Sequence, residues 1–159
     1  MYVKRKNDLK EIRANSWDPC LYFSMNIQVA VLCDAATQDS SNKLNLLGAF
    51  DTIYAQQVPV MHLQCAVALR VTFDAGEDGQ HKLGLNFINA DGRSILPPVE
   101  MPIMVTLPED VHFITLNFVM TIPQLQFPEA GFYSVDIRLD DQSQASIPLQ
   151  VKLIQRPAA

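Results

Sequence analysis

The feature that most constrains this fold is a two-residue alternation of apolar and polar side chains that recurs from Met25 to Ile154. It is clearest in CAVALRVTF (65–73), FITLNFVMTI (113–122) and FYSVDIRLD (132–140). Such alternation is typical of β-strands with one buried face, which needs a second layer of strands to cover it. The pattern therefore predicts an all-β fold. We expect an antiparallel β-sandwich of about eight strands, immunoglobulin-like or C2-like in outline, with a closed barrel as the alternative.

The first strand and a proline-rich segment carry local predictions. In MNIQVAVLCD (25–34), alternation places a row of residues on one face: Ile27, Val29, Val31 and Cys33. Further along, Pro97-Pro98 and Pro102 interrupt an apolar segment. Proline cannot donate to a ladder of backbone hydrogen bonds, so this segment is predicted to be an edge strand, broken or bulged.

The run KLNLLGAFDTI (43–53) interrupts dense apolar residues with one glycine, Gly48. A glycine inside a strand commonly marks a bulge or a close approach of backbone, so we interpret the run as a bent strand. The next segment, TIYAQQVPVMHLQ (52–64), is the longest predicted loop. Its apolar side chains either cap the open end of the sandwich or contact another protein or a second subunit. An edge strand is a second route to self-association.

The chain divides into two parts at Met25. Residues 1–24 are predicted to be a disordered tail or an upstream start that precedes the natural one, with an arm docked through Leu21, Tyr22 and Phe23 as the alternative. Residues 25–155 are predicted to form a single sandwich domain. The chain contains three cysteines without a CxxC pair, and residues 1–24 lack the apolar core of a secretory signal. We therefore expect cytoplasmic residence.

Charge and hydropathy exclude two classes of partner. The net charge is −5, and residues 25–159 are more acidic than the whole chain. An acidic body repels phosphate, so nucleic-acid binding is not expected. No run of 18 apolar residues occurs, so no membrane span is expected.

Three segments together resemble a bacterial family of uncharacterised proteins. They are MNIQVAVLCDAAT (25–37), KLNLLGAFDTI (43–53) and FPEAGFYSVDIRLDDQSQASIPLQV (127–151). The last contains a closing hairpin of the form G-x-Y-x-x-x-I-x-x-D. The resemblance covers about residues 25–154 and implies a compact β-sandwich, a domain of unknown function. It implies no activity and no site residue.

Histidine and cysteine give little support for chemistry. His62, His81 and His112 are interpreted as surface or turn residues, because a metal site needs several ligands to converge. If the strands simply alternate in direction, Cys33 and Cys65 lie inside but at opposite ends, on the order of 25 Å apart at 3.3 Å per residue. No disulfide bridges that distance, so both are predicted to be buried free thiols.

The carboxylates form the one specific hypothesis. With alternating strands, nine acidic residues gather in loops at one end, including Glu77 and Glu109. Acidic loops at the end of a sandwich are how C2-type domains bind calcium, although acidic residues also gather wherever turns do. The candidate metal ligands are Asp34, Asp39, Asp74, Asp78, Asp110, Asp140 and Asp141.

No nucleophile elbow, metalloprotease motif or phosphate-binding loop occurs in the sequence. We therefore predict a non-enzymatic module, protein-binding or structural, that uses no cofactor. The alternative is an acidic-rim calcium- or ligand-binding domain, followed by an enzyme of unrecognised type.

Overall fold

The computed structural model describes residues 25–155, and the predicted tail at residues 1–24 lies outside them. This part of the chain is all-β, as predicted, with nine strands rather than about eight. The strands are β1 (Asn26–Gln38), β2 (Leu44–Phe50), β3 (Thr52–Ala55), β4 (Val60–Asp74), β5 (Gly79–Asn89), β6 (Val99–Val105), β7 (Phe113–Phe127), β8 (Gly131–Leu139) and β9 (Gln142–Leu153).

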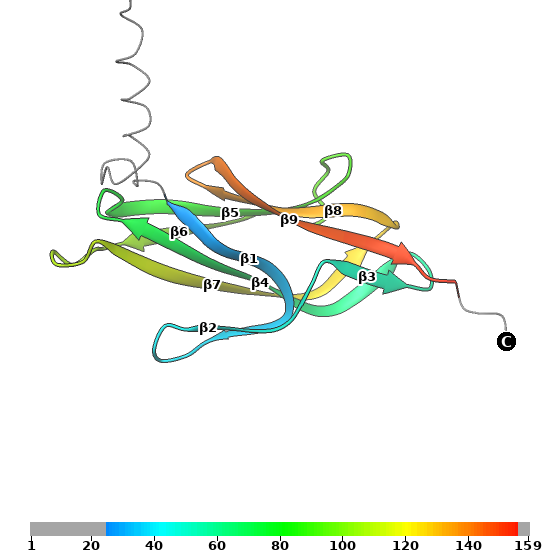
Figure 1. The fold of residues 1–159 in the computed structure, drawn as a ribbon. Coiled ribbons are helices and arrows are strands. Elements are labelled where there is room, and N and C mark those ends of the chain that lie inside the picture. The colour runs from blue at the N-terminus through cyan, green and yellow to red at the C-terminus, as the bar shows by residue number, and fades with distance from the viewer. Residues whose placement is uncertain (1–24, 156–159) are drawn as a thin grey trace, which may run out of the picture.

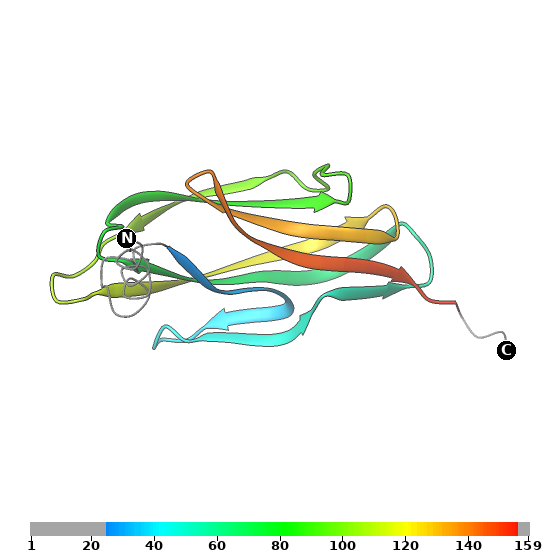
Figure 2. The same ribbon diagram turned by 45° about the horizontal axis from the view of Figure 1, so that its top comes forward.

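The strands form two sheets that pack face to face (Figure 1). One sheet has the order β2-β1-β4-β7 and the other has the order β3-β9-β8-β5-β6. A broadly sandwich-like architecture is thus confirmed, but the all-antiparallel prediction is wrong at one pair. β3 runs parallel to β9, with Thr52 opposite Gln150 and Ala55 opposite Leu153. Figure 2 shows why: the chain passes from β2 directly into β3 and crosses from one sheet to the other without reversing.

The core lies between the sheets and is built from the predicted alternating rows. From β4, the residues Val67, Leu69, Val71 and Phe73 are at most 1% exposed. They belong to one apolar cluster with alternate residues of β5, β8 and β9. Each fully buried aliphatic side chain contributes about 1.5–3 kcal/mol relative to an exposed one. This single continuous core determines which face of each strand points inward.

β1 breaks the predicted alternation because it contains a β-bulge. Ile27 lies opposite Val71, but Val29 lies opposite Arg70, so the register shifts by one residue between them. A shift of one residue moves every later side chain to the other face. The prediction that Ile27 and Cys33 share one face is therefore wrong. Cys33 lies on the outer face of the sheet, opposite Ala66.

Beyond Cys33, β1 curls away from β4, and the hairpin of β1 and β2 folds back beneath the sheet (Figure 1). A small second cluster forms there from Cys33, Ala66 and Ala68. The tip of the hairpin reaches the outer face of β4 and β7. There the Arg70 guanidinium donates to the Asn42 carbonyl (3.3 Å), and Asn42 Nδ2 donates to the Thr115 carbonyl (2.9 Å). β4 is consequently buried on both faces at residues 65–69.

The run 43–53 is a bent strand, as interpreted from the sequence. Gly48 has a positive φ of 64°, and a Cβ at this position would meet the Asp34 side chain. Both observations require glycine, because other L-residues rarely adopt this conformation and no space is left for a side chain. The segment 52–64, however, is not the long loop that the sequence predicted. It consists of β3, a turn over residues 56–59 and the beginning of β4.

The proline-rich segment lies at a sheet edge, as predicted, but the described strand pairs with β5 in a continuous register and is not bulged. β6 is an edge strand, Pro97 and Pro98 precede it, and Pro102 lies within it opposite Lys82. Proline at an edge removes one of the backbone donors that another strand would need.

Candidate functional site

The predicted acidic end is assembled only in part, and its carboxylates bond to the protein itself. Asp78 accepts from the Leu107 backbone N–H at 2.6 Å, and Asp140 accepts from the Lys82 N–H at 2.8 Å. Asp141 forms an ion pair with the Lys82 ammonium at 2.8 Å. The first contact joins the β4–β5 and β6–β7 loops, and the other two join the β8–β9 turn to β5.

The remaining candidates do not join them in a ligand set. Asp34 lies against Gly48, and Asp39 accepts from the Ser41 and Lys43 N–H groups inside its own turn. Asp74 closes the neighbouring turn through its backbone, and Asp110 lies in the loop before β7. Within residues 25–155, no group of three or more His, Cys, Asp or Glu residues is arranged to hold a metal ion. Calcium binding therefore stays a prediction, which calorimetry can test, because the carboxylates described here do not converge as metal ligands.

His81 is a titratable side chain at this end that is hydrogen-bonded through both ring nitrogens. Its Nδ1 lies 2.7 Å from Asp140 Oδ2, and its Nε2 lies 2.8 Å from the Glu77 carbonyl. The Asp140 hydrogen bond raises the pKa of His81, partly opposed by burial, and the same bond lowers the pKa of Asp140. A protonated imidazole donates to both acceptors, which leaves neither nitrogen to take a proton from a substrate. The two hydrogen bonds therefore link β5 to the β8–β9 turn and to the β4–β5 loop.

The histidine predictions are correct only for His112, which is exposed in the loop between β6 and β7. His81 lies in β5, with a side chain only 12% exposed. His62 lies in β4, packs against the Phe50 ring at 5.2 Å between centroids, and has a buried Nε2 without a hydrogen-bond partner. Both lie inside strands because the strands extend further toward the turns than the sequence indicated.

The two described cysteines are buried free thiols, as predicted, but their predicted separation is wrong. Cys33 lies opposite Ala66, the neighbour of Cys65, because β1 and β4 are adjacent antiparallel strands. Burial raises the pKa of Cys65 to about 11, with smaller contributions from Cys33 and Asp34. Burial is also the main cause that raises the pKa of Cys33. Both thiols therefore stay protonated and unreactive near neutral pH.

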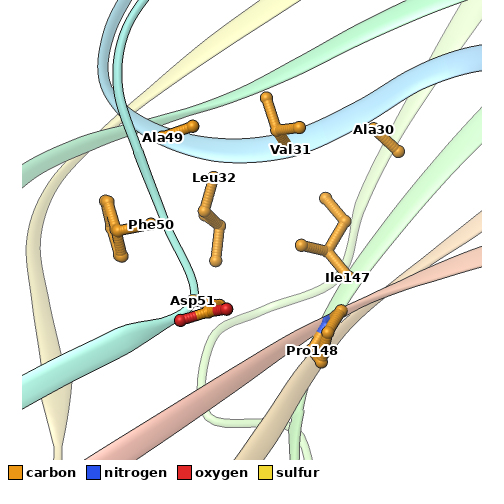
Figure 3. A pocket seen from close by; sticks show the side chains of 8 residues that line it. All are labelled: Ala30, Val31, Leu32, Ala49, Phe50, Asp51, Ile147 and Pro148. Carbon is orange, nitrogen blue, oxygen red and sulfur yellow. The ribbon is translucent and has the colours of Figure 1, made fainter.

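A shallow apolar pocket lies where β1 passes β9 (Figure 3). Leu32 and Ile147 point into the space between the two strands, and Asp51 lies at its rim. The Asp51 carboxylate accepts from the Thr52 hydroxyl at 2.9 Å, and its backbone carbonyl accepts from the Gln150 N–H at 2.8 Å. Specific ligand sites combine an apolar lining with several converging polar groups, and this pocket lacks the second element among the residues described.

The outermost strands of the two sheets differ in how well they are protected from pairing with another strand. β3 has four residues, and β2 is interrupted by the positive φ at Gly48. β6 carries Glu100 and Pro102 within seven residues. β7, in contrast, runs from 113 to 122 without a proline, a glycine or a charged residue. Long, regular, uncharged edges are the ones that accept a further strand, so β7 is the candidate site.

We define the open edge as the side of residues 113–122 that faces away from β4, where no strand of residues 25–155 pairs with it. A groove of about 200 Å³ lies beside it, between β7 and β6. Leu116, Phe118 and Met120 point toward the core there but are only half-buried. Their partners on β4, Val71, Leu69 and Val67, are at most 1% exposed. The sandwich is therefore incompletely covered along the open edge.

The sequence carried a signal for this site that the alternation alone did not reveal. Residues 111–128 contain no Asp, Glu, Lys or Arg, although 18% of the chain is charged. Alternation predicts that the run is a strand, but its position at the edge of a sheet depends on pairings between distant segments.

The family model for DUF6941, a family of unknown function, matches residues 28–152. The chain belongs to this family. The match extends from β1 into β9, so the DUF6941 region includes both sheets and the open edge. The resemblance found in the sequence is thereby confirmed as a domain of unknown function. No curated protein matches the chain. Residues 25–155 contain no helix with the length and hydrophobicity that crossing a bilayer requires.

Proposed function

We propose that this DUF6941 domain is a non-enzymatic protein-binding module that accepts an extended segment of a partner as an additional strand along β7. The single observation that carries the proposal is the open edge itself: ten residues, 113–122, without charge or proline and without a described strand on their outer side. Backbone N–H and C=O groups along such an edge supply a partner strand with hydrogen bonds, and alternate side chains supply specificity.

The half-buried row of Leu116, Phe118 and Met120 adds apolar contact to the backbone hydrogen bonds that a partner strand forms. Covering Leu116, Phe118 and Met120 removes apolar surface from water, at roughly 25 cal/mol for each Å² buried. A partner segment with apolar residues at alternate positions would extend this row. One backbone acceptor is already engaged, since Asn42 donates to the Thr115 carbonyl. We therefore expect the residues from 116 to 122 to provide most of the ladder.

The non-enzymatic part of the proposal rests on the state of the reactive side chains. His81 is bonded through both ring nitrogens, and the two described thiols are buried with raised pKa values. Free thiols also suit the reducing cytoplasm, which is where we expect the module to act. An immunoglobulin-like or C2-like outline would suit such a role and stays a prediction.

The proposal is tested by capturing partners from the native host with the full-length chain and two matched variants. Met120→Lys places an ammonium group in the half-buried row beside the open edge, whereas Met104→Lys places one on β6, where the methionine is 68% exposed. The long lysine side chain can reach water from either position, so both variants should fold, which circular dichroism checks.

We expect Met104→Lys to retain the captured partners and Met120→Lys to lose them, because charges pointing inward at an edge block strand addition. Cross-linking followed by mass spectrometry should place the contact within residues 113–122. Equal capture by both variants, or cross-links confined to another surface, would overturn the proposal.

A further inference from the structure

We propose that the strand that pairs with β7 is β7 of a second copy of this chain, antiparallel, with the two Phe118 residues facing each other on a two-fold axis. The inference rests on the proposed function and names the partner that fits the open edge best. A twofold arrangement joins the two four-stranded sheets into one continuous sheet.

The charge distribution favours a second copy over a charged partner. The chain carries a net charge of −5, so two copies repel each other over most of their surfaces. Residues 111–128 contain no Asp, Glu, Lys or Arg, so two copies can meet there without opposing like charges. A charged peptide, in contrast, would find no complementary side chain along the open edge.

The symmetry restricts the register. In a continuous antiparallel sheet, core-facing residues lie opposite core-facing residues. One residue must therefore lie directly opposite its own copy, with the two-fold axis between them. The stretch of β7 that precedes Pro123, which has no backbone N–H, is 113–122. Phe118 is the middle one of the five core-facing residues in this stretch, which are Ile114, Leu116, Phe118, Met120 and Ile122.

This register produces compatible pairs on both faces. On the inner face, Phe118 lies opposite Phe118 of the second copy, and Leu116 lies opposite Met120. On the outer face, Thr115 lies opposite Thr121. Aromatic pairs and threonine pairs are favourable across strands, and the two half-buried rows become one longer row. The nearest acidic residues in the sequence, Glu109 and Asp110, precede β7 and lie outside the paired stretch.

Oligomeric state and register are measured on the full-length chain by sedimentation velocity and by disulfide trapping. We expect the wild-type chain and Met104→Lys to form dimers. Met120→Lys should raise the dimer dissociation constant roughly a hundredfold, because its ammonium group would be buried opposite Leu116 without a counter-charge. The trapping variant is Phe118→Cys, with Met104→Cys as its matched control. Both carry Cys20→Ser, which removes the one native cysteine other than the buried Cys33 and Cys65.

Opposed residues in an antiparallel pair have Cα atoms about 4.5–5.5 Å apart, a spacing that a disulfide can bridge. A mild oxidant should therefore link Phe118→Cys into a covalent dimer much faster than Met104→Cys. A chain that stays monomeric up to hundreds of micromolar, a dimer that is indifferent to Met120→Lys, or equal linking at both positions would overturn the inference. If the chain is monomeric but Met120→Lys still abolishes capture of another protein, only the second copy is excluded and strand addition stands.

Discussion

The two lateral sides of the sandwich are closed in different ways. On one side the chain itself crosses from sheet to sheet, through β2 and β3, and the β1–β2 hairpin covers the outer face of β4 (Figure 1). On the other side β6 and β7 border a groove, with no ladder between them in the described part of the chain. We call these the hairpin side and the groove side.

The difference is visible in the residues that each side uses. The hairpin side depends on residues that fit only this fold: a glycine against Asp34, two alanines beneath the hairpin, and Asn42 bonded to β4 and β7. The groove side leaves Leu116, Phe118 and Met120 half-buried and lacks protection on β7. The hairpin side is therefore closed within one chain, whereas the groove side leaves an edge at which we propose that another strand pairs.

The strongest test of this comparison is Gly48→Ala. Alanine at a φ of 64° is strained, and its Cβ would meet the Asp34 side chain. We expect the free energy of unfolding to fall by about 3 kcal/mol, which combines the cost of a left-handed non-glycine residue with overpacking. Urea denaturation measures the change.

The matched control for this prediction is Gly92→Ala. Gly92 also has a positive φ, 76°, but nothing lies within 4 Å of a Cβ built there. We expect a loss of about 1–2 kcal/mol from the backbone alone. Equal losses for the two variants would show that the contact with Asp34 does not define the hairpin side.

A smaller loss is expected when the hairpin tip is released from the sheet. Asn42→Gly tolerates the φ of 60° at this position but removes the side-chain bonds to the Thr115 carbonyl and to Asn117. Each lost bond costs about 0.5–1.5 kcal/mol, so we expect a loss of about 1.5 kcal/mol. Amide exchange in the hairpin should also accelerate.

Ser41→Ala, at an exposed position in the same turn, should change neither stability nor exchange. Release of the tip also frees the Thr115 carbonyl, so Asn42→Gly should not weaken dimerisation through β7. A dimer lost in Asn42→Gly would show that the hairpin side and the groove side are coupled, contrary to the comparison.

The same contrast explains what could be predicted from the sequence. The alternation predicts two layers and the inward rows of β4, β5 and β8, because large apolar side chains alternate there mainly with small or polar ones. It fails at Val29–Cys33, where apolar residues occupy every position. The bulge lies just before this run, between Ile27 and Val29, and a run without polar residues does not show that the register has shifted. The parallel pairing of β3 with β9 and the edge position of β7 depend on contacts between distant segments, which local patterns do not encode.

The smallest expected effect concerns the acidic end, where His81 and Asp140 join β5 to the turn between β8 and β9. Asp140 raises the pKa of His81 above its ordinary value of 6.5. The stabilisation by protonated His81 is therefore complete below pH 6.5 and is lost as the pH rises through the pKa of His81 in the folded protein. His81 lowers the pKa of Asp140 below 3.8, so that contribution is lost as the pH falls through its folded value.

The pair should therefore stabilise the fold most between about pH 4 and 6.5. Because Asp140 is 41% exposed, solvent screens the pair, and we expect the free energy of unfolding to fall by no more than about 1 kcal/mol toward pH 8. Asp140→Asn tolerates the positive φ of 50° and removes the charge, so it should flatten this dependence and lower the pKa of His81, as followed by NMR titration and urea denaturation. If the free energy of unfolding of Asp140→Asn depends on pH as the wild type does, the His81–Asp140 pair does not stabilise this end of the sandwich. Dimerisation through β7 should not follow this titration, because His81 and Asp140 lie outside residues 111–128, which contain no Asp, Glu, Lys or Arg.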